Sequence, residues 1–307
     1  MSTERVATLA ASSTRGWRSG AGFFADYWAL TKPDVNLLIL ITTAAGFCLA
    51  LPAHLVAFPI LLLVHTLAGT LLVASGTATL NQYVERRFDA QMRRTKRRPL
   101  AAGRIEPSRA LWFGILLSVS GAVYLAAAVN LLASLLAVLT LLSYLLIYTP
   151  LKRKTPLCTL VGAFPGAAPP LIGWAAVSGT LSLEAWVLYG LVFLWQFPHF
   201  MAIAWMYRED YVRAGYLVLP YGERRNSLMQ LQAVLPSFAL IALSFAPMLL
   251  GKAGLFYTAG ALFFSICFLY YGGQLAVRKT NDAARRLLLA SILYLPAVFA
   301  FLVLDRT

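Results

Sequence analysis

Long apolar runs alternate with short polar segments along most of this chain. Each run extends for about 20 residues, which is the length that a helix needs to cross a bilayer. Barrel strands would alternate apolar and polar residues, and these runs do not, so the pattern predicts an all-α integral membrane protein. We expect nine transmembrane helices, at 35–53, 56–80, 109–128, 131–149, 157–177, 184–206, 230–250, 254–273 and 287–304.

The first 34 residues differ from the rest because they are polar and carry scattered basic side chains. They contain no short apolar core that ends in a cleavage site, so they lack the pattern of a secretory signal peptide. We expect residues 1–34 to form a cytoplasmic tail that is partly disordered. Residues 35–304 are expected to form a single transmembrane domain.

The composition supports a membrane protein, and the distribution of basic residues indicates its topology. The chain is 60% hydrophobic and 12% charged, whereas soluble domains are about 25% charged. Of the 26 Lys and Arg residues, 24 fall in the tail or in connections on one side of the predicted bilayer. The positive-inside rule makes this side cytoplasmic and puts the carboxyl terminus outside, as in a multi-pass protein of the plasma (inner) membrane. The net charge of +14 is thus a topology signal and does not indicate nucleic-acid binding.

A ladder of polar side chains follows the second apolar run, within NQYVERRFDAQMRRTKRRPL (81–100). Asn81, Glu85 and Asp89 are four residues apart, so a helix would place all three on one face. Two carboxylates and an amide oxygen suit a hard cation, and Mg²⁺ commonly takes a few carboxylates together with phosphate oxygens. Arg94 and Arg98 follow, and guanidinium groups match the geometry of phosphates. The stretch therefore predicts a site for Mg²⁺ and a diphosphate near the cytoplasmic surface.

A solvated helix end explains the same residues without a ligand, since its acids could pair with the neighbouring arginines. Such a ladder is common in water but rare directly after a membrane span, where ionisable residues usually have a function. From the ladder alone, both interpretations stay open.

A second polar cluster follows the sixth apolar run, within WQFPHFMAIAWMYREDYVRAGYLVLP (195–220). Here His199 is followed by Asp210, again at the cytoplasmic end of a span. A membrane histidine can also simply hydrogen-bond to a neighbouring helix, so this cluster is ambiguous by itself. After the fourth run, Lys152 and Lys154 either anchor the topology or reach the same anion as the arginines of the first cluster.

Four stretches of the chain resemble the UbiA superfamily of intramembrane prenyltransferases, and several of their elements are typical of its heme-modifying branch. The resemblance implies nine transmembrane helices around a central cavity, with helical caps on the cytoplasmic side. It covers most of residues 30–220, while the last third matches only as apolar spans. The stretches are LTKPDVNLL (30–38), NQYVERRFDAQMRRTKRRPLAAGRI (81–105), YTPLKRKTPLCTLVGAFPGAAPPLIGW (148–174) and WQFPHFMAIAWMYREDYVRAGYLVLP (195–220).

The resemblance also implies a reaction at the membrane. The farnesyl group of farnesyl diphosphate would be joined to a vinyl group of heme B with addition of water, which gives heme O and diphosphate. Mg²⁺ would be the cofactor. Terminal oxidases or a heme A synthase would be candidate protein partners, because they use heme O or heme A.

The ladder and the resemblance together give a set of expected site residues. The residues expected to bind the metal are Asn81, Glu85, Asp89 and Asp210. His199 is expected to bind heme, either as a ligand of the iron or by orienting the water that adds. The residues expected to act in catalysis are Asn81, Glu85, Asp89, His199 and Asp210, and those expected to bind the diphosphate are Arg94, Arg98, Lys152 and Lys154.

The chain departs from the family pattern at several positions. The middle acid of the usual NxxxDxxxD ladder is Glu85, whose one extra methylene keeps the ligand type. Asp34 stands where the family often has a basic residue, and Cys158 stands where it often has Asn, so neither is assigned as a ligand. The second cluster lacks the usual DxxxD pattern, and His199 and Asp210 are expected to replace it.

Two other functions fit parts of the pattern. An aromatic quinone precursor could replace heme as the prenyl acceptor, although the heme-branch elements argue against it. A transporter would also carry ionisable residues near its spans. Transporters place their sites near the midplane of the bilayer, however, whereas these clusters lie at helix ends.

Overall fold

The computed structural model describes residues 20–52, 57–219 and 223–306 of the chain, and all regular elements within them are helical. Among these residues, nine helices or runs of consecutive helices are long and apolar enough to cross a membrane, which confirms the predicted spans. They are α3 (Pro33–Ala50), α4 (Ile60–Asp89), α5 (Pro107–Ala128), α6 with η1 and α7 (Leu131–Leu142, Ser143–Tyr148, Thr149–Leu151), α8 with α9 (Cys158–Gly166, Pro169–Ser178), α10 (Leu183–Met206), α12 with α13 (Glu223–Leu243, Ala246–Leu249), α14 (Leu255–Arg278) and α15 (Asn281–Leu304).

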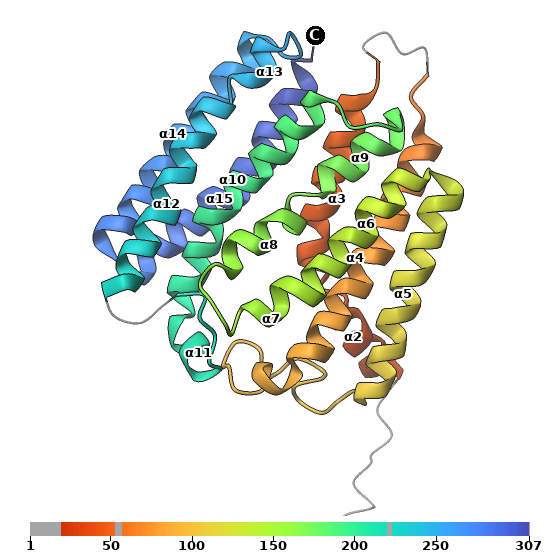
Figure 1. Cartoon of the computed structure of the whole chain (residues 1–307), viewed down its shortest axis with the longest axis vertical. Coiled ribbons are helices and arrows are strands. Elements are labelled where there is room, and N and C mark those ends of the chain that lie inside the picture. The colour runs from red at the N-terminus through yellow and green to blue at the C-terminus, as the bar shows by residue number, and fades with distance from the viewer. Residues whose placement is uncertain (1–19, 53–56, 220–222, 307) are drawn as a thin grey trace, which may run out of the picture.

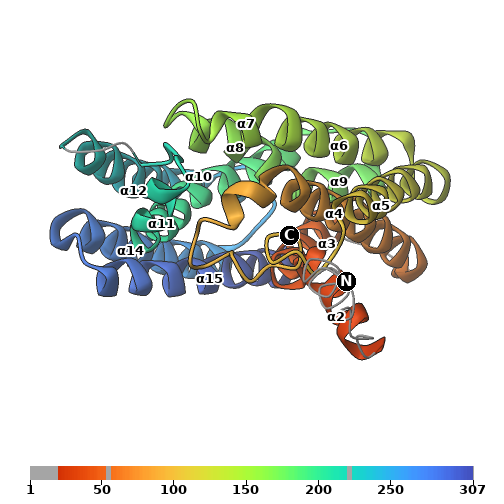
Figure 2. The ribbon, with the colours of Figure 1, turned by 90° about the horizontal axis from the view of Figure 1, so that it is seen from below.

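The spans run side by side as a bundle, with their short connections gathered at two ends (Figure 1). One end carries α13 and the last residues of the chain. The opposite end carries α7, the short helix α11 (Arg208–Arg213) and the segment 90–106, and we call it the polar end. Seen from the polar end, the segment that follows α4 crosses the middle of the bundle, and α11 lies beside it near α10, α12 and α14 (Figure 2).

Helix α4 is the longest element and continues nine residues past the predicted end of its apolar run at residue 80. The continuation is possible because its polar residues face the protein interior rather than lipid. Asn81, Glu85 and Asp89 are all buried, as is Gln82. The predicted ladder is therefore helical to its last residue, as the four-residue spacing requires.

Two spans contain breaks that an ideal helix would not have. The fourth span passes through a π-helical segment, η1, and such segments are frequent at functional sites. The fifth span is interrupted between Gly166 and Pro169, since proline lacks the N–H that a continuing helix would use. Both breaks lie beside the central cavity described below.

Close helix contacts hold α3 against α9. A Cβ added to Gly46 would collide with the carbonyl oxygen of Pro170, and one added to Gly173 would collide with that of Thr43. Helices in a membrane associate mainly by close packing, so small residues at such contacts stabilise the pair.

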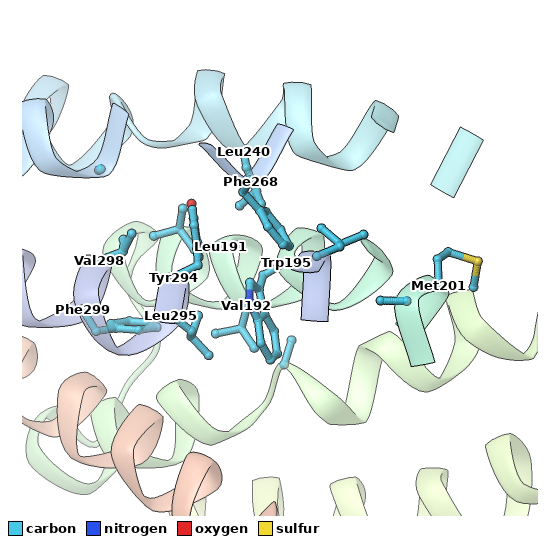
Figure 3. Packing of buried hydrophobic residues seen from close by; sticks show 14 of the residues in the cluster. Leu191, Val192, Trp195, Met201, Leu240, Phe268, Tyr294, Leu295, Val298 and Phe299 are labelled. Atoms are coloured by element: carbon cyan, nitrogen blue, oxygen red, sulfur yellow. The ribbon is translucent and has the colours of Figure 1, made fainter. Parts of the chain in front are cut away.

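The largest buried cluster of apolar side chains lies between α10, α12, α14 and α15. Leu191 and Trp195 of α10 face Tyr294 and Leu295 of α15, with Phe268 of α14 beside them (Figure 3). This cluster fixes α15 against the helix that carries His199.

Part of the segment assigned to the tail is helical. Residues Gly20–Leu30 form α2, and the Gln82 side chain donates hydrogen bonds to the carbonyl oxygens of Ala29 and Leu30. Arg104 also forms an ion pair with Asp26, with 2.8 Å between the charged atoms. The carboxyl-terminal part of the predicted tail is thus attached to the polar end, and residues 1–19 lie outside the described residues.

Candidate active site

A cavity of about 430 Å³ opens at the polar end and reaches into the bundle. Its walls come from α3, α4, α6, η1, α8, α9, α10 and α15. Asp89 and Val73 both line it. A helix rises about 1.5 Å per residue, so these two residues of α4 lie about 24 Å apart along the helix axis. The cavity therefore joins a charged mouth to an apolar interior.

The ladder of α4 forms one wall of the mouth. Asn81, Glu85 and Asp89 all line the cavity, although each side chain is almost wholly shielded from solvent. The sequence prediction that the three would share one face is thus met in the structure. Buried carboxylates are costly unless they are paired, so the partners of these side chains are informative.

Each member of the ladder is paired with a different cation. The Lys152 ammonium lies 2.9 Å from Glu85 Oε1. Arg98 donates to both carboxylate oxygens of Asp89, at 2.9 and 2.8 Å. The Lys32 ammonium donates to Asn81 Oδ1 at 3.0 Å. These three cations come from separate segments of the chain and all line the cavity, so positive charge surrounds the ladder.

Lys32 was missed as a site residue, although it stands in the matched stretch LTKPDVNLL. Its backbone is left-handed, with φ 52°, which a non-glycine residue adopts at a cost and which often marks a functional position. Burial lowers the pKa of Lys32 to about 7, with a further contribution from the nearby Arg98. An additional anion in the mouth would stabilise its charged form.

Lys152 is held in place by aromatic groups and by the backbone. Its ammonium lies 4.5 Å from the ring centroid of Tyr148, and its carbonyl oxygen accepts a hydrogen bond from the Leu217 N–H. Burial opposes the charge of Lys152, but Tyr148 and the Glu85 carboxylate hold its pKa well above the usual value. The side chain is therefore a permanent cation at the mouth.

Tyr216 was also missed by sequence reasoning. Its hydroxyl donates to Glu85 Oε1 at 3.0 Å, the same oxygen that Lys152 contacts. It lies in the segment that follows α11 and is buried. The signal that could have found it is its place within the matched stretch 195–220, but its target on α4 is far away in sequence.

Asp210 is near the site but does not join the ladder. Its carboxylate accepts hydrogen bonds from the backbone N–H groups of Arg93 and Arg94, both at 3.0 Å, and pairs with Arg213 at 3.1 Å. It is buried and is not among the residues that line the cavity. Burial would raise the pKa of Asp210, but its two N–H donors and Arg213 hold that pKa below the usual value.

The Asp210 contacts place Arg94 at the mouth. The Arg94 guanidinium lies 4.5 Å from the ring centroid of Tyr207, and it donates to the Tyr211 hydroxyl at 3.4 Å. Arg94 lines the cavity together with Arg98 and Lys152. Lys154, the fourth residue expected to bind the diphosphate, is exposed and does not line it.

His199 lines the cavity on the α10 wall, although it lies more than a hundred residues after the ladder in the sequence. Its ring stacks on Trp195, with 4.7 Å between the ring centroids and an interplanar angle of 22°. Its Nδ1 atom lies 2.7 Å from Ser291 Oγ. The structure thus brings His199 and the ladder to one cavity, as expected.

The oxygen atoms of the ladder fit Mg²⁺ provided that a diphosphate supplies the remaining ligands. Within the described residues, no three His, Cys, Asp or Glu side chains lie together as a metal-binding group. The ladder offers two carboxylates and one amide oxygen, and Mg²⁺ is commonly bound through one or two carboxylates with waters and substrate phosphates as the remaining ligands. These hard oxygen donors suit Mg²⁺ when a diphosphate supplies further ligands.

A sequence model of the UbiA prenyltransferase family matches residues 39–300 of this chain. A relative named protoheme IX farnesyltransferase, from Solibacter usitatus, is 48% identical over 92% of this chain and 98% of its own length. The enzyme of the same name from Koribacter versatilis is 40% identical over 94% of this chain and 95% of its own. Protoheme IX farnesyltransferase 1 of Pseudomonas putida is 40% identical over 98% of both chains.

Solved structures agree with the fold at lower sequence identity. A digeranylgeranylglyceryl phosphate synthase superposes with a TM-score of 0.70 at 18% identity, covering 92% of this chain and 98% of its own. A UbiA homologue from Archaeoglobus fulgidus, bound to GPP and Mg²⁺, superposes with a TM-score of 0.63 at 15% identity. That comparison covers 90% of this chain and 99% of the homologue.

Proposed function

This chain belongs to the UbiA prenyltransferase family, and from that premise we propose that it transfers the farnesyl group of farnesyl diphosphate to a vinyl group of heme B. It is a multi-pass membrane enzyme with the activity of a protoheme IX farnesyltransferase. Water adds in the same reaction, so the products are heme O and diphosphate. The observation that carries the proposal is the full-length similarity to enzymes of that name, at 40–48% identity.

The charged mouth is suited to the diphosphate of the prenyl substrate. Arg94, Arg98 and Lys152 line it, and Lys32 lines it as well. Guanidinium groups bind phosphate oxygens in pairs, whereas an ammonium acts as a point charge. Together they stabilise the negative charge that develops as diphosphate leaves.

Mg²⁺ is the cofactor that we propose for the ladder. Asn81, Glu85 and Asp89 would hold it, and when bound it would neutralise the leaving diphosphate as a Lewis acid. Lys152, Arg98 and Lys32, which contact the ladder in the structure, would then contact phosphate oxygens. Asp210 has its carboxylate directed at the 93–94 backbone, so we assign it to positioning that loop rather than to the metal set.

The interior of the cavity is suited to the farnesyl chain and to heme. Its walls are mostly apolar or aromatic, with Val73, Ile172 and Tyr148 among them. The bond between the farnesyl C1 and the diphosphate oxygen breaks, and the electron pair leaves with the diphosphate. The vinyl group of heme then forms a bond to C1, and water captures the cation beside the porphyrin ring and loses a proton. Aromatic faces stabilise an allylic cation in such a dry site.

His199, on the α10 wall of the cavity, is the proposed heme-binding residue. It lines the same cavity as the ladder, and its imidazole is one of the few groups there that can ligate iron. Orienting the water that adds is its other possible role. A ligand of the iron fixes the porphyrin and thereby brings one vinyl group toward the prenyl carbon.

The orientation of the protein in the membrane follows from its charges. The polar end carries most of the Lys and Arg residues, so we propose that it faces the cytoplasm, with the carboxyl terminus outside and the protein in the plasma (inner) membrane. Farnesyl diphosphate would then enter with its headgroup at the cytoplasmic surface. A heme A synthase or a terminal oxidase is the proposed consumer of the product.

Mass spectrometry of the extracted heme tests this function. Purified protein in detergent is incubated with heme B, farnesyl diphosphate and Mg²⁺, in the presence and absence of a chelator. We expect heme that has gained farnesyl and water, and we expect the chelator to abolish that gain. Unmodified heme together with prenylation of 4-hydroxybenzoate in a parallel reaction would contradict the acceptor and identify an aromatic prenyltransferase instead.

A further inference from the structure

Ser291 of α15 contacts two of the aromatic residues that α10 contributes to the cavity wall, His199 and Trp195. Its Oγ lies 2.7 Å from His199 Nδ1, and its backbone carbonyl accepts a hydrogen bond from Trp195 Nε1 at 2.9 Å. Ser291 is fully buried and lies within the apolar contact between α10 and α15. Neither the sequence patterns nor the resemblance pointed to this residue.

The hydrogen bonds of Ser291 determine which nitrogen of His199 carries the proton. Ser291 Oγ also lies 2.6 Å from the carbonyl oxygen of Leu288, and two oxygens at that distance require a hydrogen between them. A serine hydroxyl has one hydrogen, and a carbonyl oxygen has none to give. The hydroxyl therefore donates to Leu288, and Ser291 Oγ accepts from the Nδ1–H of His199.

The proton on Nδ1 leaves Nε2 with a free lone pair. Within the described part of the chain no hydrogen bond to Nε2 is present, and the ring lines the cavity. Stacking on Trp195, whose own N–H is fixed by the Ser291 carbonyl, restrains rotation of the imidazole. A metal-binding histidine usually donates its second ring N–H to a fixed acceptor in this way.

We propose that Ser291 is a positioning residue that holds His199 in the Nδ1–H form and presents its Nε2 lone pair to the iron of heme B. This inference rests on the proposed function, because heme is its ligand. Ser291 itself does not touch the substrate. Its contribution is the orientation and basicity of the imidazole, which sets how strongly and in which pose heme is bound.

Heme binding without turnover tests the proposal. Full-length Ser291→Ala protein is titrated with heme B in the absence of farnesyl diphosphate, and the Soret band and heme affinity are measured. Loss of such a second hydrogen bond typically lowers affinity by roughly 10–100-fold, and we expect a change in that range. The alanine keeps the backbone carbonyl for Trp195, so the change removes only the hydroxyl, with its contacts to His199 and to the Leu288 carbonyl.

A matched control and a double-mutant cycle separate positioning from packing. Ser237→Ala removes another fully buried hydroxyl that donates to a carbonyl of its own helix, on α12, and should leave heme binding unchanged. The effect of Ser291→Ala should vanish in a His199→Ala background, because the two residues then no longer interact. An equal effect in both backgrounds, or no effect in either, would overturn the proposal.

The same measurements distinguish this inference from the proposed function. If the unsubstituted protein binds heme through His199 yet forms no heme O, the proposed activity fails while the role of Ser291 stands. If it forms heme O but the cycle shows no coupling, the role of Ser291 fails alone. A protein that binds no heme at all would overturn both.

Discussion

The Asp210 carboxylate determines where Arg94 stands without lying in the cavity itself. It accepts the backbone N–H groups of Arg93 and Arg94, which come from a segment more than a hundred residues earlier. A single buried side chain thus joins α11 to the loop after the ladder. The position of Arg94 at the mouth depends on this contact as well as on the aromatic ring beneath the guanidinium.

We expect Asp210→Ala to weaken binding of farnesyl diphosphate. A hydrogen bond to a charged group contributes about 1.5–3 kcal/mol, so losing this anchor should raise the KM for farnesyl diphosphate by roughly 10–100-fold. The Mg²⁺ concentration that gives half-maximal activity should stay unchanged. Steady-state kinetics at varied substrate and metal concentrations measure both quantities.

Glu209→Ala is the matched control, because it removes a neighbouring carboxylate that is exposed to solvent. It should leave both kinetic quantities unchanged. If Asp210→Ala instead shifts the Mg²⁺ dependence and leaves the KM for farnesyl diphosphate as it was, Asp210 is a metal ligand and the positioning role is wrong.

Residues of the site differ in how far the sequence reveals them. Asn81, Glu85 and Asp89 could be grouped beforehand because helical periodicity alone places them on one face. Lys32 and Tyr216 could not be grouped with them, since their contacts with the ladder depend on how distant segments fold together. Ser291 carries no signal at all, because a buried serine on an apolar helix usually bonds only to its own backbone.

At the scale of elements, the pair α3 and α9 shows how small residues bring the cavity walls together. Gly46 and Gly173 allow the two backbones to approach so closely that neither position has room for a methyl group. Both helices contribute side chains to the cavity. A shift between them would therefore alter the shape of the site as well as the stability of the bundle.

We expect Gly173→Ala to destabilise the folded protein. Overpacking a tight contact costs typically about 1–3 kcal/mol, and here the obstacle is backbone that cannot rotate away. The thermal unfolding temperature in detergent should fall, as followed by intrinsic fluorescence together with size-exclusion profiles after heating.

Gly273→Ala on α14 provides the comparison, since nothing lies within 4 Å of a Cβ at that position. Alanine is favoured over glycine within a helix by about 1 kcal/mol, so this variant should be at least as stable as the original protein. Equal unfolding temperatures for the two variants would contradict the close contact between α3 and α9.

The spans could be predicted from hydropathy because each must hide its backbone from lipid over a fixed thickness. Their internal breaks could not be placed in the same way. The π-helical segment η1 lies in a run that is apolar throughout, so nothing in its residue pattern marks it. The helical extension of α4 through the ladder could be expected from the four-residue spacing, but hydropathy alone ends the span at residue 80.

At the scale of the whole molecule, the two ends of the bundle differ sharply in charge. The polar end collects the cations of the mouth together with those of the neighbouring loops, and the opposite end carries few, among them Lys252 and Arg306. On the proposed function, the same charges that would orient the chain during insertion would also bind the substrate headgroup.

Cysteine labelling tests the orientation. In a background whose three native cysteines are replaced by alanine, Gln91→Cys places an exposed thiol at the polar end and Thr180→Cys places one at the opposite end. We expect a membrane-impermeant maleimide to label position 180 in intact cells and position 91 only after permeabilisation. The reverse pattern would contradict the proposed topology and leave the assigned reaction untouched.

The pairing of every ladder residue with its own cation has a consequence for the order of events in the cell. Mg²⁺ alone would displace Lys152 and Arg98 from their carboxylate partners and leave two cations without partners in a shielded site. Diphosphate alone would meet two carboxylates. When Mg²⁺ and diphosphate bind together, the carboxylates pair with the metal and the cations pair with the phosphate oxygens. Each ligand would therefore raise the affinity for the other. On this proposal Mg²⁺ alone would bind the site weakly, and the supply of farnesyl diphosphate would determine when the metal is bound.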